Sequence, residues 1–305
     1  AMCADFTACP DPLARAPRAG GRASVLIAPL SLQGALSAVV WRDTAGLALN
    51  AAQKLNHFPA TPLVCLSWFQ GMDIGLIESS EGGAPRWRPL DAALTWSGSQ
   101  SHPLLSWSPS VGRAGMACFP VDVAHALFGV DPHDLLDRFA PAQAVLDASW
   151  QGLLDDLLAS ANPHAALAAL EHHLAPRWQA LRQRADPAPS LAQIGRHWVQ
   201  RLAWQAMQWR DSHGERQIER RIKRYSGRSL REWRMLVKTE GALFAGLQRH
   251  HAGLPLDLAA LAHEQGFADQ AHLSRATKRI TGFAPAEFAR RFVEDESFWV
   301  YRLWV

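Results

Sequence analysis

Hydrophobic and polar positions follow two different periods along this chain, and the change falls near residue 121. From residue 25 to about 120, short apolar runs such as VLIAPL, TPLVCLSWF and MACFPV are separated by Gly, Pro, Ser and Asp. That texture is typical of β-strands joined by turns. After 121 the apolar residues recur at helical spacing, so the sequence predicts a β-rich part followed by helices.

The helical pattern predicts several separate elements after 121. Residues 142–160 carry one apolar stripe, as an amphipathic helix requires. Asp131 followed by Pro132 fits an N-cap and first helical position, so we expect a helix over 131–140. A helix pair is expected over 162–184.

The same pattern divides the chain into domains. Residues 1–24, rich in Ala, Pro, Gly and Arg, are expected to be a mobile tail. Residues 25–184 form a predicted β-rich sensor or dimerisation domain with flanking helices, and 185–190 (DPAPS at its core) form a linker. Residues 191–305 show no strand-like alternation, so an all-α domain should follow, which gives an α+β fold class.

Composition and charge support a folded protein with two unlike halves. A hydrophobic fraction of 48% and a charged fraction of 19% exclude a disordered chain. Residues 1–189 hold 12 Lys and Arg against 16 Asp and Glu, whereas residues 190–305 hold 19 against 12. A basic C-terminal part next to an acidic N-terminal part is expected when one domain faces a polyanion.

Two features of the sequence indicate the cellular compartment in which the protein is expected. Ala23–Trp41 lacks charge, but Pro29 and Gly34 divide it into two short runs that suit strands better than a membrane helix. The four cysteines are scattered and form no CxxC pair, which favours a reduced, cytoplasmic protein with no membrane association.

An internal repeat at an offset of 55 residues carries the functional prediction. IERRIKRYSGRSLREW (218–233) aligns without gaps on LSRATKRITGFAPAEF (273–288), with five identical positions. Each copy has a basic helix, a Gly that can end it, and a short helix ending in an aromatic residue. Upstream of the second copy, an apolar helix face, Gly266 and the capping Asp269 complete the outline of a helix-turn-helix. The first copy has the same outline, with Asp211 in the slot of Gly266.

GFADQAHLSRATKRITGFAPAEF resembles the second helix-turn-helix signature of bacterial AraC/XylS-type regulators. The features that carry the resemblance are Gly266-Phe267, Asp269-Gln270, Arg275, Lys278, Gly282 and Pro285. The resemblance spans about 195–290. Leu273 and Thr277 stand where the family usually has Phe, and Ala271 where it often has Ser, which suggests a rearranged core under the second recognition helix. The resemblance implies double-stranded DNA as partner and a cupin-like N-terminal domain that binds an effector or mediates dimerisation.

Positions on either side of the buried apolar residue of each recognition helix are predicted to read bases. They are Glu215, Arg216, Glu219 and Arg220 around Ile218, and Gln270, Ala271, Ser274 and Arg275 around Leu273. Arg can grip guanine, Gln can pair with adenine and Glu can accept from cytosine. Basic residues one turn later suit phosphate contacts, which position the protein without specifying sequence. These are Lys223, Arg224, Lys278 and Arg279.

The N-terminal part offers fewer predictions. We expect an internal apolar pocket for a small effector, with Trp68, Trp96 and Trp107 as candidate lining residues. His57 and His102 stand alone, so no metal is expected, and no cofactor motif is present.

The leading prediction is a transcription regulator that is not an enzyme, and two alternatives to it remain. The first is an enzyme, such as a repair protein using a reactive cysteine, with a DNA-binding appendage. The second is an interaction protein whose helix-turn-helix units have lost DNA binding. RNA polymerase and a second copy of the chain are further candidate partners.

Overall fold

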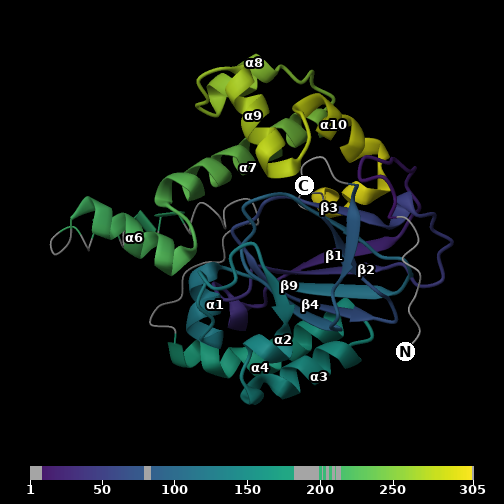
Figure 1. The fold of residues 1–305 in the computed structure, drawn as a ribbon, viewed down its shortest axis with the longest axis vertical. Helices are drawn as coiled ribbons and strands as arrows, with labels where there is room; N and C mark the ends of the chain where they lie inside the picture. Colours follow the sequence, from purple (N-terminus) through teal and green to yellow (C-terminus); the bar gives the residue numbers. More distant parts are fainter. Residues whose placement is uncertain are drawn as a thin grey trace.

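A computed structural model describes residues 9–78, 84–181 and 214–303, together with residues 199–200, 202–203, 206–207 and 210. In Figure 1 a β-rich half lies below a helical half, and helices α1–α4 cover the lower face of the strands. The fold class is α+β, as the sequence predicts.

The strands form two antiparallel sheets with nested pairing. One sheet has the order β1-β2-β9-β4-β7-β10 and the other β3-β8-β5-β6. Strand β2 pairs with β9, β3 with β8, β4 with β7 and β5 with β6. This is the order of a jelly roll, the double-sheet architecture of cupins. The strands are β1 (Arg22–Ile27), β2 (Ala38–Asp43), β3 (Leu55–Phe58), β4 (Val64–Gln70), β5 (Gly75–Glu78), β6 (Arg86–Pro89), β7 (Leu94–Ser97), β8 (Leu104–Trp107), β9 (Arg113–Phe119) and β10 (Phe139–Pro141).

The larger sheet has a helical layer on its outer face. Alternate large residues such as Leu66, Trp68 and Trp96 share one core with Leu153 and Leu170 of the helices. Side chains alternate between the two faces of a strand, so the intervening small residues point between the sheets. The covering helices are α1 (Val121–Phe128), α2 (Ala142–Val145), α3 (Gln151–Ala159) and α4 (Pro163–Leu181).

The C-terminal half is helical over its described residues. Its elements are α6 (Glu215–Ser226), α7 (Leu230–His251), α8 (Leu258–Glu264), α9 (Gln270–Thr281), α10 (Pro285–Glu294) and α11 (Trp299–Arg302). Figure 1 shows α6 projecting at one end of α7, with α8 and α9 at the other end. After α10 the chain returns to the sandwich, where the 3₁₀ turn Glu296–Phe298 and α11 contact β3.

Part of the expected tail is ordered. Strand β1 begins at Arg22 within the predicted tail 1–24, and the backbone N–H of Glu296 donates to the carbonyl of Ala16 at 3.0 Å. Residues 13–19 therefore contact α10 and the turn that follows it, a long-range contact that composition does not reveal. The expected linker 185–190 lies outside the described residues.

Several helix predictions were wrong. The single amphipathic helix expected over 142–160 is broken at Leu146 and Asp147, where the chain is extended between α2 and α3. The short helix expected to end at Trp233 continues to His251 as α7. Residues 132–137 form turns, and 139–141 become strand β10 paired with β7, because the edge of β7 offers backbone partners that outweigh the Asp131-Pro132 start signal. Residues 163–181 form one helix, with Pro176 inside it, in place of a helix pair. No helix in the described part of the chain is long and apolar enough to cross a membrane.

Candidate DNA-binding surface and effector cavity

The second helix-turn-helix is built by two aspartate caps and one glycine. The Asp257 side chain accepts from the backbone at the start of α8, and Asp269 accepts from the N–H of His272 at the start of α9. Gly266, between the helices, has φ +71°, a left-handed conformation that glycine adopts without strain. These local signals hold α8 and α9 in the predicted arrangement, as the spacing of the motif requires.

Helix α9 buries one face and exposes the other. Leu273 and Ala276 pack on Phe267, Leu261 and Ala262 in a small core. Of the predicted base-reading residues, Gln270, Ala271 and Arg275 are exposed and Ser274 is half-buried. Lys278 and Arg279, predicted to contact phosphate, are exposed one turn later. Among the described residues, none of the ion pairs involves Arg275, Lys278 or Arg279, so all three are available to a ligand.

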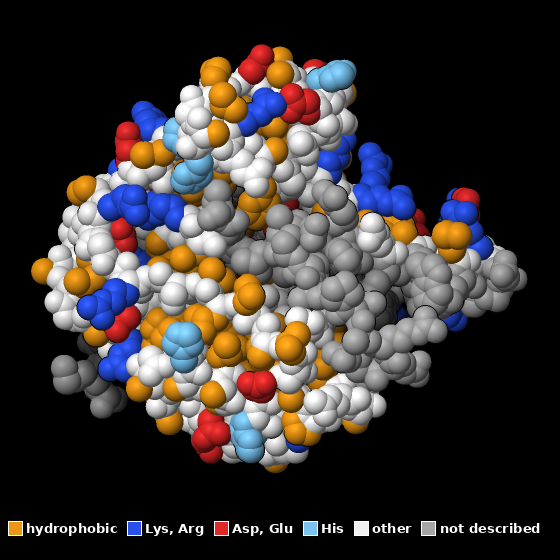
Figure 2. Space-filling view, turned by 180° about the vertical axis from the view of Figure 1, so that it is seen from behind, with side chains coloured by type: hydrophobic (Ala, Val, Ile, Leu, Met, Phe, Trp, Pro, Cys, Tyr) orange, Lys and Arg blue, Asp and Glu red, His pale blue; other side chains and the backbone are white. Residues whose placement is uncertain are grey.

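Helix α6 has the same division of faces. Ile218 and Ile222 are buried in the core that includes Leu202 and Trp233. The predicted DNA contacts all lie on the exposed side: Glu215, Arg216, Glu219, Arg220, Lys223 and Arg224. Lys223 Nζ lies 3.9 Å from Glu219 Oε1, an exposed pair that water screens. Figure 2, seen from behind, shows Lys and Arg side chains on this projecting part at the right edge.

Helix α7 joins the two recognition helices. It begins with a capping box in which Ser229 accepts from the N–H of Glu232 and the Glu232 carboxylate accepts from the N–H of Ser229. Its 22 residues at the usual rise span about 33 Å. This length is close to the roughly 34 Å of one turn of B-DNA. The first helix of the first unit, upstream of α6, falls largely outside the described residues.

The departure at Thr277 leaves a small void beneath α9. Thr277 is buried, and together with Leu273 and Phe288 it lines a cavity of about 30 Å³. Whether this core is rearranged relative to the family, as the sequence predicts, stays a prediction. Thr277 is smaller than the Phe that the family usually has at this position, so it fills less of the space.

The space between the two sheets forms a larger cavity. It has a volume of about 150 Å³ and is mostly apolar. Polar groups on its wall include the hydroxyls of Ser67, Thr95 and Ser106, and the cations of Arg42 and Lys54. The Thr95 hydroxyl is buried without a hydrogen-bond partner. Such a cavity suits a small apolar molecule with a few polar contacts.

The three tryptophans predicted to line the pocket do not line it. Trp68 and Trp96 face the helical layer, in one core with Phe119 and Phe128. Trp107 faces outward from the second sheet and packs with Leu55 and Ile77. Each alternates with a small residue that does line the cavity, so the prediction placed the correct strands but the wrong face.

Residues that the sequence reasoning missed close one end of this cavity. Trp299 and Val300 of α11 line it, packed on Val40, Cys65 and Cys118. The aromatic-rich end of the chain, FWVYRLWV, was the signal that could have indicated a buried C-terminal segment.

Arg42 joins α11 to the sandwich. Its Nη2 lies 3.0 Å from Glu296 Oε1, and both side chains are buried. Burial lowers the pKa of Arg42 to about 10, which leaves the guanidinium charged at neutral pH. The guanidinium carbon lies 4.7 Å from the ring centroid of Trp299, whose Nε1 donates to Asn56 Oδ1 at 2.8 Å.

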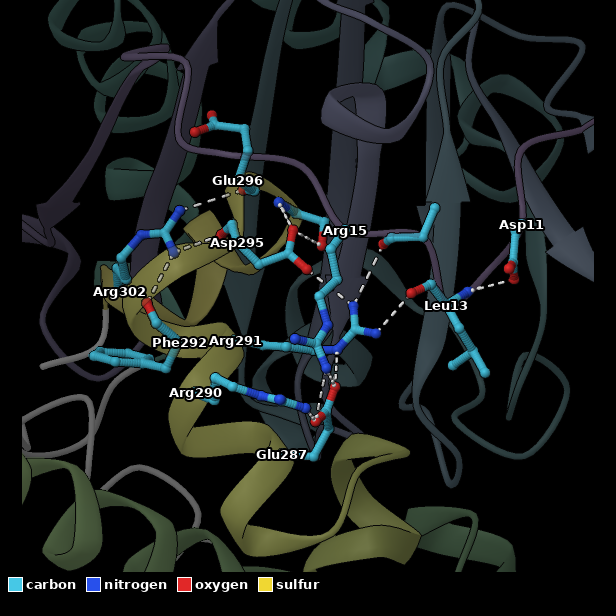
Figure 3. Close-up of polar contacts among 12 residues, drawn as sticks. Asp11, Leu13, Arg15, Glu287, Arg290, Arg291, Phe292, Asp295, Glu296 and Arg302 are labelled. Atoms are coloured by element: carbon cyan, nitrogen blue, oxygen red, sulfur yellow. Dashed lines mark hydrogen bonds and ion pairs between the residues drawn. The ribbon is translucent and has the colours of Figure 1, made fainter.

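A second polar network holds α10 against the N-terminal segment (Figure 3). Arg291 donates to Glu287 at 2.7 Å, to Asp295 at 2.9 Å and to the carbonyl of Leu13 at 2.7 Å. Glu287 also pairs with Arg15 at 2.8 Å. The hydrogen bonds from Arg291 and Arg290, together with Arg15, lower the pKa of Glu287 to about 2.

The two isolated histidines lie in different surroundings. His57 is buried between Phe283 and Phe298, and desolvation lowers its pKa to about 3. His102 lies in an exposed turn beside Ser101. Among the described residues, no group of three or more His, Cys, Asp or Glu could hold a metal ion.

A cysteine nucleophile would need a lowered pKa, whereas among the described residues the pKa values of Cys9 and Cys118 are raised. The Cys65 and Cys118 sulfurs lie 3.7 Å apart, and contact with Cys65 and burial raise the pKa of Cys118. Burial also raises the pKa of Cys9.

Solved structures similar to this chain include ToxT from Vibrio cholerae with an unsaturated fatty acid bound, at 12% identity and a TM-score of 0.34, covering 77% of this chain and 93% of that one. An apo ToxT variant has 12% identity and a TM-score of 0.40, covering 87% and 99%. No curated protein matches the chain.

The family comparison concerns the C-terminal part. Residues 212–291 match the family model described as a helix-turn-helix domain, and this range contains α6, α7, α8 and α9. With the motif from Gly266 to Pro285 in place, residues 212–291 are a helix-turn-helix domain of the AraC/XylS type.

Proposed function

We propose that this chain is a sequence-specific, DNA-binding transcription regulator of the AraC/XylS type, modulated by a small apolar effector. Effector binding is assigned to residues 25–184 and DNA binding to residues 191–305. The observation that carries the proposal is a pair of basic, exposed recognition helices, α6 and α9, at opposite ends of one rigid helix.

The length of α7 supports simultaneous contact with two major-groove segments. Helices separated by about one turn of DNA can enter the groove on the same side of the duplex. One chain then reads an asymmetric site, and bending of the duplex improves the fit where the two helices are not parallel.

The exposed residues divide into two roles in this proposal. Arg216, Glu219, Arg220, Gln270, Ala271, Ser274 and Arg275 read bases. Lys223, Arg224, Lys278 and Arg279 contact phosphates, which supplies affinity that depends on salt but not on sequence.

The cavity between the sheets supports the effector part of the proposal. It is enclosed by both sheets and has an apolar wall with a few hydroxyls and cations. An effector regulates DNA binding only if it favours one arrangement of the two parts of the chain. The contacts of α11 with the cavity provide a route for such a preference.

Selection of duplexes from a random pool by the full-length protein tests this function. We expect enrichment of two short motifs whose centres lie about 10 base pairs apart. The Arg275→Ala variant should lose one motif, while Arg88→Ala, an exposed arginine on β6, should select the same sequences as the unmodified chain. A folded protein that enriches no sequence would contradict the proposal and favour an interaction protein.

A further inference from the structure

Three sulfur-containing side chains line one part of the cavity between the sheets. Cys65 of β4 and Cys118 of β9 lie directly opposite each other in the antiparallel register, and Met116 lies two residues before Cys118. Residues two apart on a strand point to the same face, and all three line the cavity. Figure 1 shows β4 and β9 side by side in the larger sheet. The inner face of this sheet therefore brings three sulfur-containing side chains together.

The separation of the two cysteine sulfurs fits two ligands of one metal ion. The Sγ atoms of Cys65 and Cys118 lie 3.7 Å apart, and both residues are buried. Thiolate sulfur lies about 2.3 Å from a metal ion such as zinc. At that bond length two sulfurs are about 3.8 Å apart for a tetrahedral angle and about 4.0 Å apart for a trigonal one. The observed distance needs almost no change to accept an ion between the two sulfurs.

The kinds of side chain at this place select for a soft ion. Thiolates and thioethers favour soft ions such as Cu(I), whereas Zn²⁺ in a closed site takes four Cys, His or carboxylate ligands. Met116 packs on the apolar cluster that contains both cysteines, so its thioether is available as a third ligand. The described residues that line the cavity include no His, Asp or Glu. Two thiolates and one thioether suit a trigonal monovalent ion and leave a divalent ion without a fourth ligand.

Two cations of the cavity can balance the charge of such a site. Two thiolates and one monovalent ion carry a net charge of −1, and a buried charge without a partner is costly. Arg42 and Lys54 line the same cavity. The Arg42 guanidinium lies over the ring of Trp299, which belongs to one cluster with Cys65 and Cys118. Arg42 is therefore separated from the cysteines by a single side chain.

We propose that Cys65, Cys118 and Met116 bind one soft monovalent cation, of the Cu(I) type, inside the cavity between the sheets. On binding, two S–H bonds break, two bonds between sulfur and the metal form, and two protons pass to solvent. The ion keeps its oxidation state, so the step needs neither an oxidant nor a reductant. This site lies beyond the proposed function and does not depend on DNA binding.

The first test measures copper uptake by the full-length protein. Copper(I) is supplied as its bicinchoninate complex, in a solution without oxygen, to protein whose thiols are reduced. The protein should remove one equivalent of copper per chain from the complex, and Zn²⁺ in excess should not displace it. Absence of uptake by the reduced protein would overturn the proposal, and so would equally tight binding of Zn²⁺.

Cysteine variants locate the uptake. Cys65→Ser and Cys118→Ser should each lose the stoichiometric uptake, because one thiolate is missing. Cys9→Ser is the matched control, since Cys9 packs in a separate cluster with Leu55 and Trp107, and it should bind copper like the unmodified chain. Undiminished uptake by a chain that carries both Cys65→Ser and Cys118→Ser would contradict the proposed site.

Methionine variants test the third ligand. Met116→Leu keeps the volume of the side chain and should weaken copper binding by about 10-fold, because a neutral thioether is a weaker ligand than a thiolate. Met72→Leu is the control. Met72 lines the same cavity beside Gly112, six residues along the chain from Cys118, and its replacement should leave the affinity unchanged. Equal effects of the two substitutions would show that Met116 is not a ligand.

X-ray absorption at the copper edge tests the site without any substitution, so it decides if a cysteine variant does not fold. The copper-loaded protein should show sulfur neighbours alone, at about 2.3 Å. Nitrogen or oxygen neighbours would refute the proposed ligands. None of these measurements uses DNA. A protein that binds copper but no DNA would therefore contradict the proposed function alone, and one that binds DNA but no copper would contradict this inference alone.

Discussion

Single positions on α9 are predicted to have separate effects on DNA binding. Arg275 lies near the start of the exposed face, and Lys278 lies one turn later. We expect Arg275→Ala to cost about 1–3 kcal/mol on the selected site and little on random duplex. Lys278→Ala should weaken binding to both duplexes alike. Equal losses on both duplexes for both variants would show that the two roles are wrongly assigned.

The void beneath α9 gives a prediction about stability. Thr277→Ile adds carbon atoms beside a cavity of about 30 Å³, and filling it should stabilise the fold by about 0.7 kcal/mol. Thr239 on α7 is equally buried but does not line this cavity, so Thr239→Ile should destabilise the fold by overpacking. Urea denaturation of both variants is the measurement. Stabilisation by both substitutions, or by neither, would contradict the account.

For single residues, the sequence predicted the spacing of buried positions better than the face of a strand to which each side chain points. Exposure of Gln270 and Arg275 followed from the helical spacing around Leu273, because α9 has only one buried face. In β4 and β7 both faces are buried, one under helices and one around the cavity. Alternation alone could not decide whether Trp68 or Ser67 lines the cavity, since each face is covered by elements distant in sequence.

At the scale of elements, we predict that ion pairs of Glu287 hold α10 in place and that their contribution to stability depends on pH. The pKa of Glu287 is lowered from 4.5 to about 2 by its arginines. A lowered carboxyl pKa stabilises the folded protein fully above pH 4.5, and this contribution is lost as pH falls through 2. Glu287→Gln should therefore lower the urea midpoint at pH 7, with a difference from the unmodified chain that shrinks between pH 4.5 and 2.

Glu294 provides the matched control for that experiment. It is exposed on the same helix. Glu294→Gln should shift the midpoint little at any pH, because an exposed carboxylate contributes little. A Glu287→Gln effect of the same size at pH 7 and pH 2.5 would show that the ion pairs do not cause it.

Elements defined by local signals were predictable, and those defined by distant partners were not. Capping by Asp269 and termination at Gly266 are local, so the helix-turn-helix followed from the sequence. Residues 139–141 became a strand because β7 lies beside them, and the N-terminal segment is ordered by Arg291, which is nearly 280 residues away. No local pattern contains that information.

In the whole molecule, the C-terminal segment joins the two halves. The β-rich half supplies the cavity, the helical half supplies the DNA-binding surface, and α11 contacts both. The sequence predicted the two halves and their order, but the return of the chain after α10 depends on burial of Trp299 between them.

The central claim is that α6 and α9 bind duplex DNA with sequence preference. Fluorescence anisotropy of the full-length protein on its selected duplex and on a scrambled duplex, between 50 and 200 mM salt, tests it most directly. The account predicts affinity for both that falls with a log–log slope of about −0.9 per phosphate contacted. It also predicts at least ~10³-fold tighter binding to the selected duplex. Equal affinity for the two duplexes, or affinity that does not change with salt, would contradict it.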